Sequence, residues 1–317
     1  MQRRVDCFEM LRAFYDEYNG CFGREEGDHM STVLEVKIPR LQRDGFALKE
    51  IEFSVEAGYL TALLGVNGAG KTTLLSAISG LLPLPEGAEV SIGGYSLREQ
   101  EKEAKECMGF VFDDSPFDEG MSALLTGQIY GPYYTNWDME KYLAYLERFE
   151  IPKKRTIRKL SKGMKMKFQL AFALSHGAKF LIMDEPAASL DPVFRDEFME
   201  VLSEILEGED CGILLSSQLV SELEAKADYT MMLHQGEQIF CDSTENVLDR
   251  FLLVRGRYEL FPYMKSRILG ERLSEYTAEG IILNDGDPVR LDLECVRPTI
   301  EDLMYYIKQG VVKKGMV

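Results

Sequence analysis

The stretch YLTALLGVNGAGKTTLLSAISGLL, residues 59–82, constrains the fold of this chain more than any other. A continuous apolar run precedes a loop with three glycines, and apolar residues with helical spacing follow it. The loop GVNGAGKTT at 65–73 matches the phosphate-binding pattern G-x-x-x-x-G-K-[ST], in the strand-to-helix context that the pattern requires. We therefore predict a buried strand, a tight loop whose amides surround phosphate groups, and a helix.

Each part of this loop has a predicted role toward a nucleoside triphosphate. Lys71 supplies a positive charge to the β- and γ-phosphates, Thr72 offers a hydroxyl ligand to Mg²⁺, and Thr73 reaches the α-phosphate. The helix that begins near Lys71 adds the positive end of its dipole. The predicted binding residues of the loop are Gly65, Asn67, Gly68, Ala69, Gly70, Lys71, Thr72 and Thr73.

The stretch FLIMDEP at 180–186 predicts a second buried strand that ends in two carboxylates. Asp184 is expected to hold Mg²⁺ through its water shell, and Glu185 to act as the general base that polarises the attacking water. Such a pair also occurs as a plain surface feature at a strand end, but here it follows a phosphate-binding loop in chain order. Because phosphoryl transfer requires charge neutralisation and an in-line water, the two stretches together predict ATP and Mg²⁺ as ligands.

The pattern of the whole chain predicts an α/β fold. Near-continuous apolar strands alternate with amphipathic helices, which indicates a buried, mostly parallel sheet. We predict a P-loop NTPase domain at 30–248, with an antiparallel β subdomain and a helical subdomain at about 115–175. Residues 1–29 are predicted to be an extension, disordered or with one short helix, and 249–317 a small C-terminal α+β appendage. The predicted strands include EVSIGG, MGFVF, GILLSS and, as one strand, TMMLHQGEQIF at 230–240.

Composition limits the cellular setting. The formal net charge of −17 argues against a general nucleic-acid binder, which usually has a basic surface. Six cysteines without a CxxC pair, and three histidines, favour reduced thiols over a zinc site or disulfides. No run approaches the roughly 18 apolar residues of a membrane span, and the first residues lack the apolar segment of a signal peptide. We expect a cytoplasmic protein whose membrane role, if any, comes through a partner.

The stretch LSKGMKMKFQLAFALS at 160–175 lies between the two halves of the predicted site. LSKGM resembles the LSGGQ-type signature of the ATP-binding subunits of ABC transporters. SLD at 189–191 follows Glu185 at the spacing of that family's D-loop. The resemblance covers about 33–245. KLSKGMKMK and the closing PTIEDLMYYIKQG are most similar to ATPase subunits of bacterial exporters with separate permease subunits.

This resemblance implies a mechanism. Two such domains pack head to tail, and ATP lies between the loop of one and the signature of the other, where Ser161 and Gly163 would contact the γ-phosphate at a helix N-terminus. Phe46 is the candidate for the aromatic residue on which adenine stacks, with simple strand packing as the alternative. Residues 153–167 hold eight Lys or Arg and no acid, which indicates either a solvated basic face or a local positive potential beside the phosphates.

Two positions depart from the family pattern. Asp113, with Asp114 as the alternative, stands where the family has a glutamine that touches Mg²⁺; a carboxylate can ligate Mg²⁺ but, when ionised, donates no hydrogen bond. Gln218 stands where the family has a histidine that bridges the γ-phosphate; its amide can donate but cannot shuttle a proton. Loss of a positioned donor or acid–base group typically lowers the rate of hydrolysis about 10²–10⁴-fold. The amide donor of Gln218 should retain part of this rate enhancement. We expect slow hydrolysis that depends on Glu185, unless the partner site carries the turnover.

The resemblance implies an ATPase subunit at the inner face of the cell membrane, which couples ATP-driven dimer closure to a separate permease, for export. The second ATP-binding domain is a copy of this chain or a different one, and the two departures favour a heteromer. Residues 114–135 would lie near the permease, with Phe117, Tyr130 and Tyr133 either exposed there or packing the helical subdomain. Two alternatives stay open: a nucleotide-gated binding module with little turnover, and an ABC ATPase acting on ribosomes or DNA. A single such domain and the negative charge argue against the latter.

Overall fold

The computed structural model describes residues 31–43, 45–112, 115–186, 192–208, 210–217, 223–287, 289 and 292–312. These residues form two units. The larger holds the described residues of 31–217 together with 231–238, and the smaller holds the described residues of 223–230 and 239–312. The predicted extension at 1–29 lies outside the described residues, and the predicted domain boundary at 248 stays a prediction.

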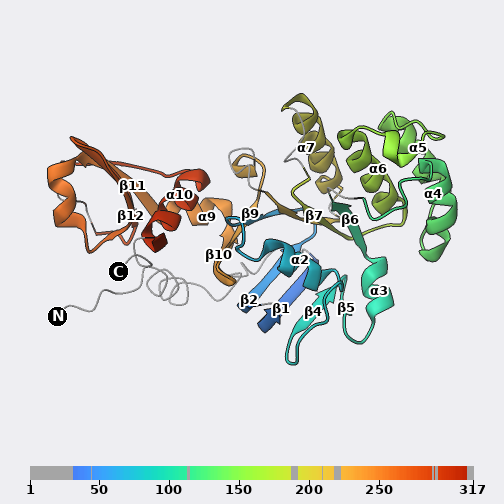
Figure 1. Ribbon diagram of the computed structural model, residues 1–317, viewed down its shortest axis with the longest axis horizontal. Coiled ribbons are helices and arrows are strands. Elements are labelled where there is room, and N and C mark those ends of the chain that lie inside the picture. Colours follow the sequence, from blue (N-terminus) through green and yellow to red (C-terminus); the bar gives the residue numbers. More distant parts are fainter. Residues whose placement is uncertain are drawn as a thin grey trace. The chain divides into compact units, whose positions relative to one another are not determined.

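A ten-stranded sheet runs through the larger unit, in the order β5-β4-β1-β2-β10-β9-β3-β8-β7-β6 (Figure 1). At one end, four parallel neighbours are short and mostly buried because their sequences are apolar runs. Their carboxyl ends meet at one edge, which confirms the predicted α/β class and brings the ends of distant strands together. These strands are β3 (Leu60–Leu64), β8 (Gly212–Ser216), β7 (Phe180–Asp184) and β6 (Met108–Phe112), and α2 (Lys71–Ile78) follows β3.

The predicted antiparallel strands belong to the same hydrogen-bonded sheet. The long hairpin of β1 and β2 pairs from Thr32↔Glu56 to Arg43↔Phe46, and β4 pairs with β1. On the other side β2 is joined to β10 in parallel through Glu237↔Lys49, so the antiparallel end continues into the parallel end. The strands are β1 (Thr32–Arg43), β2 (Phe46–Glu56), β4 (Glu89–Ile92), β5 (Tyr95–Ser96) and β10 (Glu237–Ser243).

The stretch TMMLHQGEQIF is two strands, so the prediction of one strand was wrong. β9 (Tyr229–His234) and β10 are separated by Gln235 and Gly236, whose φ angles are 48° and 83°. Two successive positive φ values are the backbone of a type I′ hairpin turn, which glycine at the second position favours. This turn directs Gly236 toward the loop that precedes α2.

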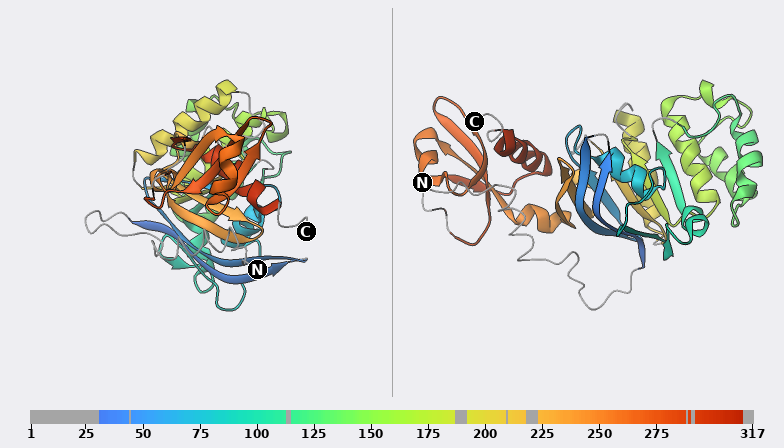
Figure 2. Two further views of the ribbon diagram at one scale, coloured as in Figure 1. Left: turned by 90° about the vertical axis from the view of Figure 1, so that its left-hand side faces the viewer. Right: turned by 60° about the horizontal axis from the view of Figure 1, so that its bottom comes forward.

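The helical subdomain consists of α4 (Ala123–Tyr130), η1 (Gly131–Tyr133), α5 (Met139–Arg148), η2 (Ile157–Lys159) and α6 (Lys162–Ser175). Its α-helices lie side by side, and α6 packs on β6 (Figures 1 and 2). Phe117 contacts Tyr130, Phe168 and Phe172, with ring centroids 4.8–5.6 Å apart. Phe117 and Tyr130 therefore pack the subdomain, whereas Tyr133 is 77% exposed. The larger unit also contains α3 (Glu101–Glu106) and α7 (Pro192–Leu206).

The smaller unit is built on an antiparallel sheet in the order β12-β13-β11-β14 (Figure 2). Helix α10 packs on β12 and β13, and Val254, Phe261 and Ile282 are buried in its core. A small antiparallel sheet with a helix packed on it agrees with the predicted α+β appendage. Its elements are α9 (Thr244–Asp249), β11 (Phe251–Arg257), η3 (Tyr258–Met264), β12 (Ile268–Leu273), β13 (Thr277–Leu283), β14 (Glu294–Val296) and α10 (Ile300–Val312).

Across the described parts of both units, no helix combines the length and the apolar composition that crossing a bilayer requires.

Candidate functional site

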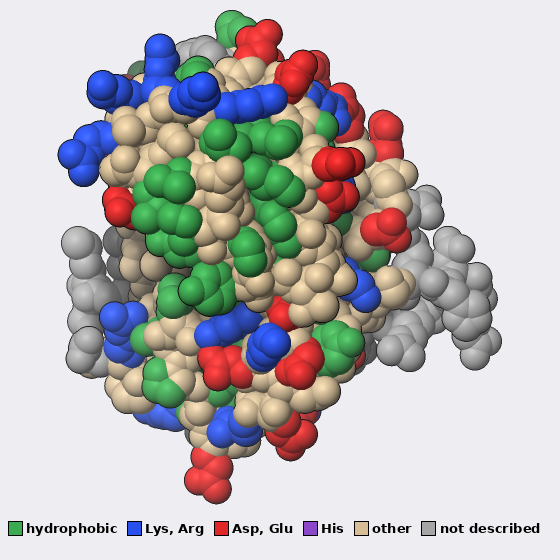
Figure 3. Space-filling model, turned by 90° about the vertical axis from the view of Figure 1, so that its right-hand side faces the viewer, with side chains coloured by type: hydrophobic (Ala, Val, Ile, Leu, Met, Phe, Trp, Pro, Cys, Tyr) green, Lys and Arg blue, Asp and Glu red, His purple; other side chains and the backbone are tan. Residues whose placement is uncertain are grey.

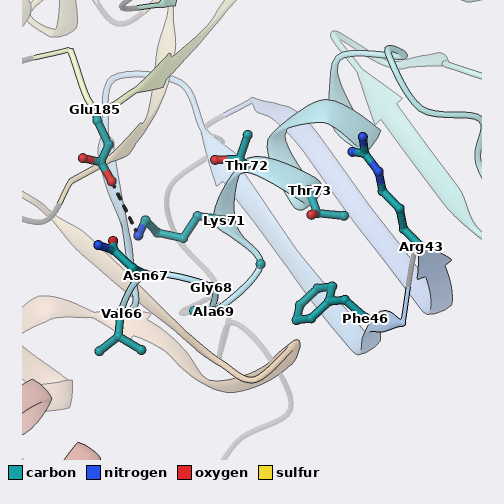
Figure 4. Close-up of a pocket in the computed structure, with 11 residues that line it drawn as sticks. Arg43, Phe46, Val66, Asn67, Gly68, Ala69, Lys71, Thr72, Thr73 and Glu185 are labelled. Atoms are coloured by element: carbon teal, nitrogen blue, oxygen red, sulfur yellow. Dashed lines mark ion pairs between the residues drawn. The ribbon is translucent and has the colours of Figure 1, made fainter.

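A cavity of about 640 Å³ lies where β3 ends and α2 begins (Figure 4). The loop at 66–70 and the first turn of α2 form one part of its wall, and the end of the β1–β2 hairpin forms another. This volume is in the range of small-ligand sites. The described residues that line it are Arg43, Phe46, Val66, Asn67, Gly68, Ala69, Gly70, Lys71, Thr72, Thr73 and Glu185.

Lys71 is a buried cation at the first position of α2. Its ammonium donates a hydrogen bond of 2.7 Å to the carbonyl of Gly65, and Nζ lies 3.6 Å from Glu185 Oε1 (Figure 4). A buried ammonium requires such partners. Because the positive end of the α2 dipole lies at the same place, this end of the cavity suits a polyanion such as a triphosphate.

Asp184 is held between two hydroxyls, one from the first turn of α2 and one from the end of the neighbouring strand β8. Thr72 Oγ1 donates to Asp184 Oδ2 at 3.1 Å, and Ser216 Oγ donates to Asp184 Oδ1 at 2.5 Å. The second bond follows from the sheet register, since Asp184 of β7 is the parallel partner of Ser216 of β8. One hydroxyl and one carboxylate, already side by side, are hard oxygen ligands that fit Mg²⁺. Bound there, Mg²⁺ would supply positive charge to phosphate oxygens.

Glu185 has a left-handed backbone directly after Asp184, with φ of 49°. Its N–H lies 3.1 Å from both the carbonyl and the hydroxyl oxygen of Ser216, which fixes this turn. As a result the two adjacent carboxylates have different partners: Asp184 contacts Thr72, and Glu185 contacts Lys71. The first arrangement suits a metal ligand, and the second suits a base that faces the cavity.

Gly236, in the β9–β10 turn, forms a backbone hydrogen bond with the phosphate-binding loop. Its N–H donates to the carbonyl of Ala69 at 2.9 Å, and its own carbonyl accepts from the N–H of Lys49 at 2.7 Å. A Cβ at this position would lie 1.9 Å from the carbonyl oxygen of Ala47, so only glycine fits. The turn thereby fixes the loop against β2.

The predicted stacking residue, Phe46, lies beside the same loop. A Cβ on Gly70 would come within 2.8 Å of Phe46 Cζ, and one on Gly236 within 3.1 Å of the same atom. These two glycines therefore allow the backbone to approach the edge of the ring closely. The ring is half-buried and lines the cavity, which agrees with stacking of a base and with strand packing alike.

The predicted signature residues lie at the start of α6. Ser161 is exposed and caps the helix, its Oγ accepting a hydrogen bond of 3.3 Å from the N–H of Met164. Gly163 is buried in the first turn. Neither residue lines the cavity, as expected if they act on the nucleotide of a second copy; that role stays a prediction.

The structure brings most of the predicted site residues together. Phe46, Glu185 and the residues from Asn67 to Thr73 line one cavity, and Gly65 and Asp184 adjoin it through hydrogen bonds to Lys71 and Thr72. The predicted residues Asp113, its alternative Asp114, Gln218 and the SLD stretch at 189–191 lie outside the described residues.

Sequence reasoning missed four residues of this site: Arg43, Val66, Ser216 and Gly236. Val66 lies within the predicted loop but was given no role there. The QG pair between two apolar runs was an available signal for the turn that contains Gly236. Ser216 ends an apolar strand that neighbours the Asp184 strand, but that neighbour relation is not visible in the sequence. For Arg43 no local signal exists, since exposed arginines at strand ends are common.

Comparison with known proteins agrees with this geometry. The family profile described as "ABC transporter" matches residues 48–188. The chain is 30% identical over 210 residues to the ABC transporter ATP-binding protein NatA of Bacillus subtilis, covering 64% of this chain and 84% of NatA. It is 31% identical over 211 residues to the linearmycin resistance ATP-binding protein LnrL of the same organism, covering 64% of this chain and 66% of LnrL.

Solved structures lead to the same family. A structure of an ATP-binding subunit of an ABC transporter superposes with a TM-score of 0.62 at 26% identity, covering 68% of this chain and 92% of that one. CbiO1 from Clostridium perfringens, part of the ABC transporter complex cbiONQ, gives a TM-score of 0.59 at 26% identity, covering 68% and 90%. With the phosphate-binding loop, the Asp184–Glu185 strand and these similarities in agreement, the chain belongs to the ATP-binding proteins of ABC transporters.

Proposed function

We propose that this chain binds and hydrolyses ATP and couples ATP-driven closure of a dimer to a separate membrane permease, for export. Domains of this family bind and hydrolyse ATP, dimerise and work with permeases. The observation that carries the proposal is the pairing of Thr72 with Asp184 and of Lys71 with Glu185 around one cavity. These pairs supply a metal position, a fixed cation and a base.

The residues would divide the reaction between them. The loop amides and Lys71 bind the phosphates, and Thr72 with Asp184 holds Mg²⁺. Glu185 orients a water and accepts its proton as the water oxygen attacks the γ-phosphorus. The bond from that phosphorus to the β–γ bridging oxygen breaks, leaving ADP and inorganic phosphate. The proton on Glu185 then returns to solvent.

An exposed apolar face supports the permease as partner. Figure 3 shows hydrophobic side chains gathered on the side of the molecule that carries the helical subdomain. Leu125 and Ile129, one turn apart in α4, and Tyr133 in η1 are exposed residues of this subdomain. Apolar side chains that gather on a surface are typical of protein interaction sites. We propose that this α4 face contacts the permease, which would hold the chain at the inner face of the membrane.

The direction of transport rests on relatives. One relative is named for linearmycin resistance, and another, in Bacillus licheniformis, for bacitracin transport; the latter is 27% identical and covers 66% of this chain and 69% of that protein. These names support export and leave the substrate of this chain open. Uptake of candidate compounds into inverted vesicles that contain the permease would test the direction, since export requires ATP-dependent accumulation inside them.

The primary test is Mg-ATP turnover by the purified full chain, with and without detergent-solubilised candidate permease. Glu185→Gln should abolish turnover while ATP still binds, because the amide cannot accept the proton. Gln218→His should raise turnover, because it restores an acid–base group. A size measurement of Glu185→Gln with ATP tests the dimer: association that requires ATP supports it, and a monomer at all concentrations contradicts it for this chain alone.

A nucleotide-gated binding module is the second candidate, favoured by the identities of Asp113 and Gln218. In that case the chain closes on ATP as the inactive half of a heteromer. Tight ATP binding with no turnover in wild type or Gln218→His would establish it. Measurable turnover that Glu185→Gln removes would exclude it.

A further inference from the structure

Arg43 lines the nucleotide cavity but has no role in the site described so far. It is the last residue of β1, and its direct antiparallel partner is Phe46, the first residue of β2. Side chains of directly opposed residues leave an antiparallel pair on the same face, with Cβ atoms about 5 Å apart. The hairpin therefore presents a guanidinium and an aromatic ring together to one cavity.

The cavity has two chemically different ends. At one end Lys71 lies 3.6 Å from Glu185, next to the amides of the loop and the start of α2. Figure 4 shows Arg43 and Phe46 on the opposite side, with the guanidinium of Arg43 beyond Thr73. If the phosphates bind at the Lys71 end, the part of the ligand that extends past Thr73 is the nucleoside. Arg43 and Phe46 are then next to the base.

The two side chains differ in how firmly they are placed. The edge of the Phe46 ring is fixed by the close approach of Gly70 and Gly236. Arg43 is exposed and has a long side chain, so it can adjust to a ligand. A planar guanidinium stacks on the faces of aromatic rings, and such contacts are strengthened when water is excluded. A fixed ring and an adjustable cation can hold a planar base between them.

We propose that Arg43 is a nucleoside-binding residue of this site, with its guanidinium stacking on the purine base opposite Phe46. The inference rests on the proposed function, because it takes ATP as the ligand. It assigns to the β1–β2 hairpin a cationic contact with the base, in addition to the aromatic one predicted for Phe46. Arg43 thereby contributes to the choice of a nucleotide over other polyphosphates.

The test compares two ligands that share phosphates but differ in the nucleoside. Titration calorimetry of the full chain, with EDTA to prevent turnover, gives dissociation constants for ATP and for inorganic tripolyphosphate. Arg43→Ala should raise the dissociation constant for ATP about 2–30-fold, the range of a cation–π contact, and change that for tripolyphosphate less than about twofold. Arg40→Ala is the matched control, since it removes an exposed arginine of the same strand that does not line the cavity.

The outcomes separate this inference from the function on which it rests. Equal weakening of both ligands by Arg43→Ala would overturn it, because Arg43 would then act on phosphates. Unchanged affinity for both would also overturn it, while ATP binding by the wild type would leave the proposed function intact. A wild type that binds neither ligand contradicts the proposed function itself. In support, Arg43→Ala and Phe46→Ala should weaken ATP binding less together than the product of their separate effects.

Discussion

The side-chain amide of Gln169 forms two hydrogen bonds with the backbone of Phe112. Its Oε1 accepts from the Phe112 N–H at 3.1 Å, and its Nε2 donates to the Phe112 carbonyl at 2.9 Å. β6 is the last strand in the sheet order of the described residues, so these backbone groups have no strand partner there. Gln169, 1% exposed in α6, takes the place of a neighbouring strand and connects the predicted signature helix to the end of β6.

Replacement of Gln169 by methionine should destabilise the larger unit by roughly 2–4 kcal/mol. The methionine keeps the volume but removes both partners of the Phe112 N–H and carbonyl. An unpaired, fully buried group costs about 1–3 kcal/mol, and because Phe112 is half-buried the lower part of that range applies to each group. Chemical denaturation measures the free energy of unfolding. Leu170→Met, a volume-conserving change at the next buried residue of α6, is the control and should cost less than about 1.5 kcal/mol. Equal losses would show that the two hydrogen bonds contribute nothing specific.

Ser216→Ala should weaken the response to Mg²⁺. The hydroxyl of Ser216 fixes Asp184, and loss of a group that orients a metal ligand typically lowers metal affinity about 10–100-fold. We expect the Mg²⁺ concentration for half-maximal turnover to rise by about tenfold or more, with ATP binding in EDTA unchanged. Ser79→Ala removes a buried hydroxyl elsewhere in the larger unit and should leave both properties unaffected. An unchanged Mg²⁺ requirement in Ser216→Ala would contradict a metal role for Asp184.

Gly236→Ala should be far more destabilising than Gly94→Ala. Both glycines have φ near 83°, where an L-residue costs about 1–2 kcal/mol. A Cβ on Gly94 meets nothing within 4 Å, whereas one on Gly236 would lie 1.9 Å from the Ala47 carbonyl oxygen. The difference in free energy of unfolding between the two variants, measured by denaturation, gives the steric contribution to the loss of stability. ATP affinity should fall only in Gly236→Ala, because the loop at Ala69 shifts. Similar free energies of unfolding for both variants would show that the backbone of this turn can shift away from the Ala47 carbonyl at little cost.

Stability should fall in acid because of His176. Burial lowers the pKa of this imidazole from 6.5 to about 4, against the opposing effect of the nearby Glu106 backbone carbonyl, and the ring stacks on Tyr134 at 4.0 Å. A lowered pKa means that the neutral form stabilises the fold fully above pH 6.5 and that this contribution is lost as the pH falls toward 4. Between about pH 7.5 and about pH 5, wild type should lose about 1–2 kcal/mol more than His176→Gln. Parallel pH profiles for the two proteins would contradict this.

Much of the larger unit could be predicted from the sequence because its signals are local. An apolar run, a glycine loop and a helix lie within 59–82, and the observed β3 and α2 follow them closely. The carboxylates at the end of 180–184 carry a local signal of the same kind, and the structure places Glu185 at the cavity and Asp184 against Thr72.

What escaped prediction depends on contacts between distant parts of the chain. Ser216 reaches Asp184 because two strands are parallel neighbours in register, and Gln169 reaches Phe112 because α6 packs on β6. The turn at Gly236 was missed for a different reason, since the apolar runs on both sides of it resemble one long strand. Arg43 joins the site only because its hairpin ends at the cavity.

The backbone at Glu185 implies a compromise between stability and activity. At φ of 49° a glutamate is held in a conformation that costs about 1 kcal/mol or more, and that glycine adopts freely. Glu185→Gly relaxes this turn but also removes the carboxylate beside the buried ammonium of Lys71. Its effect on the backbone is therefore measured against Glu185→Ala, which removes the same carboxylate and keeps the strain. Thermal melts should give a higher melting temperature for Glu185→Gly than for Glu185→Ala, and a turnover assay should show no activity in either variant. The left-handed backbone at Glu185 therefore lowers the free energy of unfolding at the position where ATP hydrolysis would occur.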